Sequence, residues 1–125
     1  MYSLFIKDCA TDQEIQQCLI SFFKDFNVSI APFDMDNKQN EEILFESSAL
    51  KGDVCVQLSI YSKVTYDTKK LVVAICKFFK TEVVISDDSD NPYSWILVSE
   101  NGDEKKIYEK VDKPDEDTFL IKTDD

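Results

Sequence analysis

Hydrophobic residues recur at helical spacing in two segments of the chain and at strand spacing in most of the remainder. In the first helical segment, Thr11 and Glu14 form a capping box, the pairing of a threonine N-cap with a glutamate three residues later. In the second segment, Thr65 or Asp67 is the expected N-cap. The apolar faces that follow these starts are Ile15, Cys18, Leu19, Phe22, Phe23 and Phe26 in the first, and Leu71, Ala74, Ile75, Phe78 and Phe79 in the second. The pattern predicts two amphipathic helices.

Short apolar or alternating runs predict the strands. Residues 54–62 show the clearest alternation, because Val54, Val56, Leu58 and Ile60 fall on one face of an extended chain. The pair Asn101-Gly102 indicates a hairpin with a type I′ turn, because both residues tolerate positive φ. The expected strands are residues 2–7, 28–33, 43–48, 54–62, 82–86, 93–99, 104–111 and 118–122.

The two halves of the chain resemble each other weakly. Phe22-Phe23-Lys24 aligns with Phe78-Phe79-Lys80, and Ile15 aligns with Leu71. Two units of strand, helix and strand can form one sheet with both helices on one face. We therefore expect a single domain over residues 1–125, of the α+β class, with two helices packed on a largely antiparallel sheet of five to seven strands.

Composition narrows the possible functions mainly by exclusion. The chain has no histidine and no arginine, and its 25 acidic residues outnumber 14 lysines, which gives a net charge of −11. Histidine is the commonest general base and metal ligand, and arginine is the usual phosphate clamp. No phosphate loop, nucleophile elbow or metalloprotease motif is present. We expect a non-enzymatic binding protein with no cofactor, no nucleic-acid partner and no membrane contact.

The cysteines and the N-terminal sequence bear on the compartment. Cys9, Cys18, Cys55 and Cys76 form no CxxC pair, and we expect them to be reduced and mostly buried, with a disulfide or a reactive thiol as the alternative. The N-terminal residues carry no signal-peptide pattern, and no run of about 18 apolar residues exists. The expected location is cytoplasmic.

The acidic residues are concentrated in particular segments. Residues 81–104 hold seven acids and no lysine, whereas residues 51–80 hold six lysines and two aspartates. Acidic surface can serve solubility alone, but carboxylates next to aromatic residues are typical of interface hot spots. The predicted partner-binding residues are Asp87, Asp88, Asp90, Tyr93 and Trp95, with Asp34, Asp36, Glu41 and Glu42 as a second contact.

Alternative roles exist for some of these residues. Trp95 could be a core residue of a strand, and the three aspartates could bind Ca²⁺ or Mg²⁺, although the EF-hand pattern fails. We expect the 87–90 loop to contribute more to binding than Asp124 and Asp125, because a chain terminus loses more entropy on docking.

The segment VVISDDSDNPYSWILVSENGDEKKIYE, together with the size and acidity of the chain, resembles the small immunity proteins of bacterial toxin systems, in particular those of contact-dependent growth inhibition. The resemblance implies a bacterial cytosolic protein that binds one basic toxin domain, often a nuclease, and blocks its active site or substrate path. It fixes no individual functional residue.

Three other functions remain open from the residues alone. The first is an acidic nucleic-acid mimic, of phage or other origin, that inhibits several nucleases or a host enzyme. The second is a structural or adaptor subunit that assembles through its sheet edge or helices. The third, which the composition disfavours, is an enzyme that uses paired carboxylates.

Overall fold

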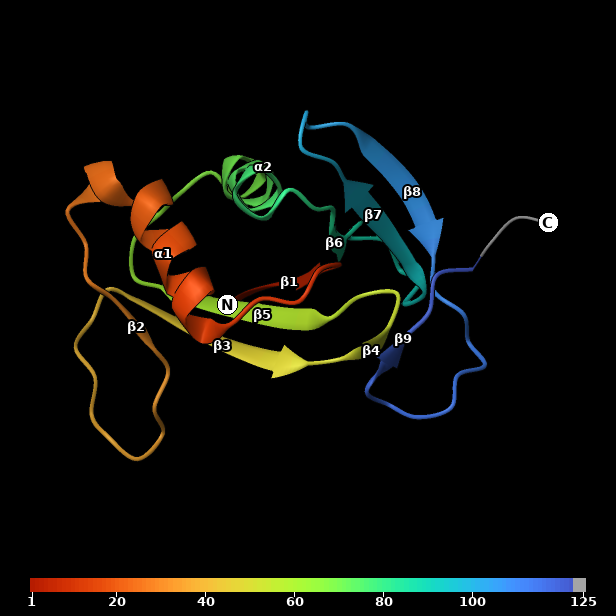
Figure 1. Cartoon of the computed structure of the whole chain (residues 1–125), viewed down its shortest axis with the longest axis horizontal. Helices are drawn as coiled ribbons and strands as arrows, with labels where there is room; N and C mark the ends of the chain where they lie inside the picture. Colours follow the sequence, from red (N-terminus) through yellow and green to blue (C-terminus); the bar gives the residue numbers. More distant parts are fainter. Residues whose placement is uncertain (123–125) are drawn as a thin grey trace.

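Two helices pack on one face of a seven-stranded sheet in the computed structural model, which describes residues 1–122 (Figure 1). All neighbouring strands in this sheet are antiparallel except one parallel pair at its edge. In spatial order the strands are β2 (Ile30–Pro32), β3 (Ile43–Ala49), β5 (Val56–Ser62), β1 (Tyr2–Ile6), β6 (Val83–Ser86), β7 (Ser94–Val98) and β8 (Glu104–Tyr108). The helices are α1 (Asp12–Phe22) and α2 (Thr68–Phe79). The predicted α+β class is confirmed.

The two helices belong to two interleaved strand–helix–strand units. The first unit runs β1–α1–β3 and the second runs β5–α2–β6. Each unit leaves a gap of one strand between its own two strands, and a strand of the other unit fills that gap. This is the split βαβ arrangement called ferredoxin-like. The weak internal similarity of the sequence therefore coincides with a structural repeat.

Helix α1 begins as its sequence predicts and ends earlier. The Thr11 hydroxyl accepts a hydrogen bond from the Glu14 backbone N–H over 3.1 Å, and the Glu14 carboxylate accepts one from the Thr11 N–H over 3.0 Å. The α-helix ends at Phe22, and a 3₁₀ turn, Lys24–Phe26, follows before Asn27 takes a left-handed conformation at φ 52°. Because of this early end, Phe26 is 42% exposed rather than part of the buried face.

Helix α2 is capped by Asp67, whose side chain accepts from the Lys70 N–H over 3.2 Å. Its buried residues are Leu71, Val72, Ile75 and Cys76. The predicted stripe was therefore partly wrong, because the helix is rotated so that Phe78 is 46% exposed.

A second, smaller core lies on the opposite face of the sheet. The C-terminal segment returns to this face and inserts Phe119 beside Val54, Val84 and Ile107. Part of this cover is a short parallel pair of strands, β4 (Lys51–Gly52) and β9 (Thr118–Phe119). Residues 51–52 are not among the strands that the sequence predicts, because a two-residue strand has no periodicity to detect.

The predicted hairpin between β7 and β8 exists, but its turn differs. The Gly102 N–H donates to the Ser99 carbonyl over 2.9 Å, and the Ser99 N–H donates to the Asp103 carbonyl over 3.0 Å. Three residues therefore connect the strands, and Gly102 adopts a φ of +86° while Asn101 keeps a negative φ. A type I′ turn needs positive φ at both central residues, so the prediction of that turn was wrong.

Candidate partner-binding surface

The loop between β6 and β7 is organised around Asp87. Its side chain is only 9% exposed, and it accepts hydrogen bonds from the Ser89 N–H over 3.0 Å and from the Ser89 hydroxyl over 2.8 Å. The Ser94 hydroxyl also donates to it, and the Lys106 amine lies 3.9 Å away. These donors, the Ser94 hydroxyl first, hold the pKa of Asp87 below its usual range. Asp87 therefore orders the loop.

Asp88 and Asp90 differ from Asp87 in being exposed. Asp88 adopts a left-handed conformation at φ 59°, and its backbone N–H donates to the Ser86 hydroxyl over 3.1 Å. Within residues 1–122, neither carboxylate takes part in an ion pair. An internally bonded aspartate thus holds two uncompensated carboxylates at the surface.

A hollow of about 630 Å³ opens beside this loop. We call it the tyrosine hollow; its lining includes Asn91, Tyr93, Tyr108, Lys110, Val111 and Lys122. Tyr93 is 38% exposed, Tyr108 43% and Val111 67%. The predicted residue Tyr93 therefore lies in a concave surface together with exposed apolar groups that the sequence reading missed. An exposed tyrosine at the end of a strand gives no signal of which neighbours it meets.

Trp95 occupies an internal position. Its ring lies 5.2 Å from Phe5 and 5.6 Å from Phe119, measured between ring centroids, and its indole N–H donates to the Glu109 carboxylate over 3.3 Å. These contacts belong to the second core, in agreement with the alternative reading of Trp95 as a strand residue. Trp95 can therefore affect a partner only indirectly, by supporting the residues around it.

The second predicted acidic segment lies in the connection between β2 and β3. Asp34 accepts from the Asn37 side-chain amide over 2.6 Å and from the Asp36 N–H over 3.0 Å, and these bonds lower its pKa. Glu42 accepts from the Ser29 N–H over 2.9 Å and from the Ser29 hydroxyl, which lowers its pKa in the same way. Asp34 and Glu42 therefore order their own connection.

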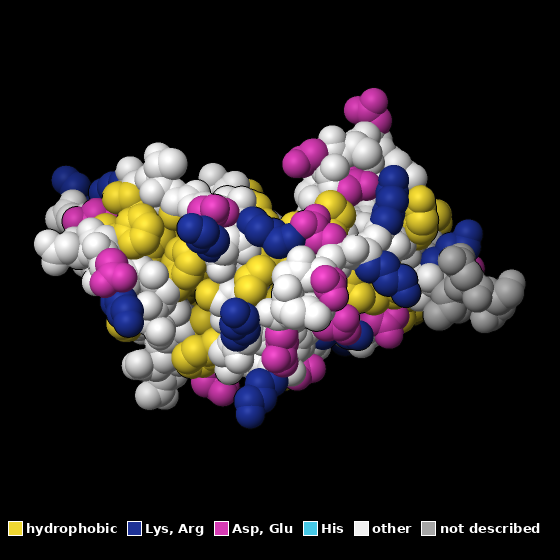
Figure 2. Space-filling model, turned by 90° about the horizontal axis from the view of Figure 1, so that it is seen from above, with side chains coloured by type: hydrophobic (Ala, Val, Ile, Leu, Met, Phe, Trp, Pro, Cys, Tyr) yellow, Lys and Arg dark blue, Asp and Glu magenta, His cyan; other side chains and the backbone are white. Residues whose placement is uncertain are grey.

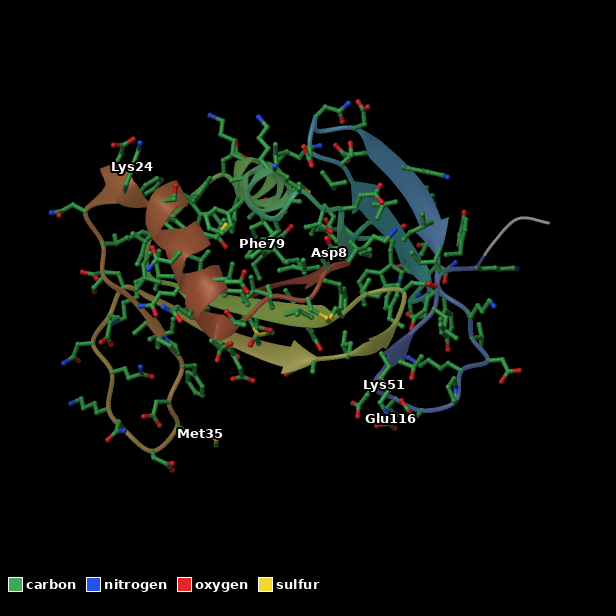
Figure 3. The ribbon with its side chains drawn as sticks, in the orientation of Figure 1. Asp8, Lys24, Met35, Lys51, Phe79 and Glu116 are labelled. Atoms are coloured by element: carbon green, nitrogen blue, oxygen red, sulfur yellow. A yellow bond between two sulfur atoms is a disulfide. The ribbon has the colours of Figure 1, made fainter. Side chains whose placement is uncertain are left out.

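The remaining two acids of this segment differ from each other. Asp36 is exposed, near Met35, which marks the tip of the connection in Figure 3. Glu41 is partly buried, and within the described residues its Oε2 atom has no hydrogen-bond partner.

The structure does not merge the two acidic segments into one patch. Strands β5 and β1 lie between β3 and β6, so the end of the β2–β3 connection and the start of the 87–90 loop are separated by three strand spacings, about 14 Å. Figure 2 shows the molecule from the helix side, where lysines are spread across the view and most acidic groups lie toward the right. We therefore treat the 87–90 loop and the tyrosine hollow as one candidate surface and the β2–β3 connection as a separate one.

The cysteines depart from the expectation of four reduced thiols. Cys9 and Cys55 form a disulfide that joins the segment after β1 to the start of β5 (Figure 3). Cys18 and Cys76 are free and buried, as expected. Burial raises the pKa of Cys18 to about 12 and that of Cys76 to about 11, which disfavours the thiolate form that reactive cysteines need.

Other parts of the described chain offer less specific chemistry. A hollow of about 540 Å³ lies at the other end of β1 and β6, where Lys7 pairs with Glu82 over 3.2 Å, and its lining mixes both signs of charge. Within residues 1–122, no three acidic or cysteine side chains converge as metal ligands do. Neither helix in this range has the length and apolar character needed to span a bilayer.

No protein family matches this sequence, and no curated protein or solved structure matches the chain.

Proposed function

We propose that this protein is a non-catalytic binding protein that neutralises a basic partner, as an immunity protein does for a toxin domain. The observation that carries the proposal is the 87–90 loop, in which Asp87 is held by internal hydrogen bonds while Asp88 and Asp90 face solvent without ion pairs among the described residues. A loop ordered before binding loses little entropy when it docks. Two fixed carboxylates are therefore suited to meet lysine or arginine groups.

A nuclease domain is the partner that suits this charge best. A nuclease attracts phosphate, so its active site carries a positive field, and an acidic protein can occupy that field in place of nucleic acid. The net charge of −11 also supports fast association with such a partner. The proposal includes no catalytic activity and no cofactor of the protein's own.

The disulfide bears on the compartment in which the protein works. A disulfide is rare in the reducing cytosol and common in oxidising compartments. The Cys9–Cys55 disulfide therefore weighs against the cytoplasmic location implied by the resemblance. The free thiols of the protein can be counted after acid quenching of the native cells. Two free thiols indicate an oxidising compartment, and four indicate the cytosol.

The experiment that tests the function is neutralisation of the product of the neighbouring upstream gene, the position expected for a toxin gene. Co-expression should rescue growth, and Asp88→Lys/Asp90→Lys should abolish the rescue. The matched control, Asp25→Lys/Glu46→Lys, changes the net charge equally at two exposed acids elsewhere and should retain it. Rescue that survives the loop variant, or fails with both variants alike, contradicts a specific role for this loop.

Salt dependence tests the electrostatic part of the proposal. Raising ionic strength from about 50 to about 500 mM shortens the Debye length from roughly 14 to roughly 4 Å. The association rate measured by stopped flow should fall strongly over this range. A flat rate, or a partner of acidic isoelectric point, would end the proposal of electrostatic docking.

Two alternatives make different predictions in the same assays. A broad nucleic-acid mimic would inhibit several unrelated nucleases with similar affinity. An adaptor subunit would bind its partner without inhibiting an activity. Asp124 and Asp125, from which we expect almost no contribution, lie outside the described residues.

A further inference from the structure

We propose that the tyrosine hollow receives one apolar side chain of the partner, while lysine or arginine residues next to that side chain meet Asp88 and Asp90. This inference rests on the proposed function and adds to it the chemistry of the partner's contact segment: an apolar anchor with basic residues on one side.

The apolar part follows from the lining of the hollow. Tyr93, Tyr108 and Val111 are 38%, 43% and 67% exposed, so three apolar groups face solvent around one concavity. The volume of about 630 Å³ is large enough for one bulky side chain, since pockets for whole small molecules have about 300–1,000 Å³. Filling such a hollow removes apolar surface from water, and interface hot spots are anchors of this kind.

The hollow is fixed before any partner arrives. The Glu109 N–H donates to the Tyr93 carbonyl and the Lys122 N–H donates to the Tyr108 carbonyl, each over 2.7 Å. The Tyr93 N–H donates to the Asn91 side chain over 2.9 Å. Three chain segments are therefore joined by their backbones beneath the two rings, and binding does not have to order them.

The charges around the hollow determine on which side of the apolar anchor the partner carries its basic residues. Asp88 and Asp90 lie in the loop that leads into Asn91 and Tyr93, and neither has an ion pair within residues 1–122. Two lysines, Lys110 and Lys122, line the hollow itself together with two acids, Glu109 and Asp112, so these charges balance. Basic residues of the partner are therefore attracted toward Asp88 and Asp90 and not toward Lys110 and Lys122.

Addition of a partner strand to β8 is the competing way to use this edge. The charged run Glu104-Lys105-Lys106 is exposed along β8, and charges of this kind oppose strand pairing at an edge. The Tyr108 carbonyl is already bonded to Lys122. These features favour docking of side chains into the hollow.

Three synthetic peptides of about ten residues test the inference on the full chain. The first has one central phenylalanine with lysines on one side, the second replaces the phenylalanine by serine, and the third replaces the lysines by glutamates. Calorimetry should show the first peptide binding at least about tenfold more tightly than either of the others. The ring resonances of Tyr93 and Tyr108 should shift on binding in NMR spectra.

Variants locate the site. Val111→Asp should lower the affinity for the phenylalanine peptide at least about tenfold, to that of the serine peptide. Met35→Asp is the matched control, because Met35 is 86% exposed in another loop, and it should leave the affinity unchanged. Circular dichroism verifies that both variants are folded.

The inference is overturned if the phenylalanine and serine peptides bind alike, if Val111→Asp has no effect, or if no peptide binds at millimolar concentration. One result would overturn this inference and leave the proposed function in place. Neutralisation of a toxin that is lost with Asp88→Lys/Asp90→Lys but intact with Val111→Asp would retain the acidic loop and remove the hollow.

Discussion

The indole N–H of Trp95 donates to the Glu109 carboxylate over 3.3 Å, and the same carboxylate pairs with the Lys113 amine over 3.0 Å. The Glu109 side chain is only 8% exposed. One glutamate therefore joins strand β7, the end of β8 and the segment that leads to β9. The tyrosine hollow and the second core share this residue, so its integrity matters to both.

Replacement of Glu109 should destabilise the fold. Glu109→Ala leaves a half-buried amine and an indole N–H without their acceptor, and we expect a loss of about 2–3 kcal/mol in the free energy of unfolding. Glu109→Gln keeps an acceptor for Trp95 and should lose less. Urea denaturation followed by circular dichroism gives the comparison. Glu116→Ala, at an exposed acid nearby, should change stability by less than about 0.5 kcal/mol; equal losses at both positions would contradict the role of Glu109.

The Cys9–Cys55 disulfide should contribute measurable stability. It closes a loop with a sequence separation of 46 residues. The chain-entropy model gives up to about 4 kcal/mol for such a loop, and residual structure in the reduced, unfolded chain lowers the expected loss on reduction to about 2–4 kcal/mol. Urea midpoints with and without dithiothreitol measure it. The Cys9→Ser/Cys55→Ser variant should show no further effect of the reductant, and four titratable thiols in unreduced, denatured protein would refute the disulfide.

Two glycines with positive φ should respond differently to alanine. Gly52 has φ +100°, and a Cβ there would lie 2.3 Å from the Phe119 carbonyl oxygen. Gly102 has φ +86°, and the nearest atom to its Cβ would be in Val73, 3.8 Å away. Gly102→Ala should cost about 1 kcal/mol from backbone strain alone, whereas Gly52→Ala should cost at least about 2 kcal/mol more, because β4 and β9 must separate. Thermal unfolding of the two variants tests the order; similar losses would show that β9 does not approach Gly52 this closely.

Alkaline pH should weaken the fold through the buried thiols. The folded-state pKa values of Cys18 and Cys76 are raised by burial to about 12 and about 11, above the usual value of about 8.5 for a thiol in the unfolded chain. Above about pH 9 the unfolded chain binds fewer protons than the folded one, so the free energy of unfolding falls as pH rises toward these folded-state values. Urea unfolding at about pH 7.5, 9 and 10 measures the slope. Cys18→Ala should flatten it, and an unchanged slope would exclude the thiol as its source.

Substitution of Asp87 should change the stability of the fold, whereas substitution of Asp88 should change binding alone. Asp87→Asn removes the charged acceptor for Ser89 and Ser94, so it should lower the melting temperature and increase the mobility of the loop. Asp88→Asn should leave the melting temperature unchanged. Because the Asp87 pKa is lowered in the folded state, its contribution is present at neutral pH and is lost as pH falls through that lowered value. Thermal scans between about pH 7 and 3 test both statements; equal behaviour of the two variants would contradict them.

Local sequence signals predicted most elements of the fold. The capping box at Thr11 and the alternation of Leu58 and Ile60 depend on residues a few positions apart, and both appear as expected. The disulfide and the β4–β9 pair join residues far apart in the chain, and no local pattern reports such distances. The turn at Gly102 differed because Asn-Gly permits more than one turn, and the register of β7 on β8 selects among them.

The candidate surface also has parts that local sequence predicts and parts that depend on residues far apart in the chain. Asp88 and Asp90 are exposed, as acidic loop residues usually are. The role of Asp87 depends on Ser94 across the loop, and the position of Trp95 depends on Phe119, which follows 24 positions later in the chain. Tyr108 and Val111 form the hollow only because the C-terminal segment returns beside them.

The interleaving of the two strand–helix–strand units governs when the chain can fold during synthesis. β1 pairs with β5 on one side and with β6 on the other, so it has both neighbours only after residue 86 has left the ribosome. Until then α1 and β3 expose their apolar faces, because the sheet to which β3 belongs and on which α1 packs is incomplete. A chain whose translation stops in α2 therefore exposes these faces and is prone to aggregation, whereas one that has passed β6 can close the central four strands in a single step.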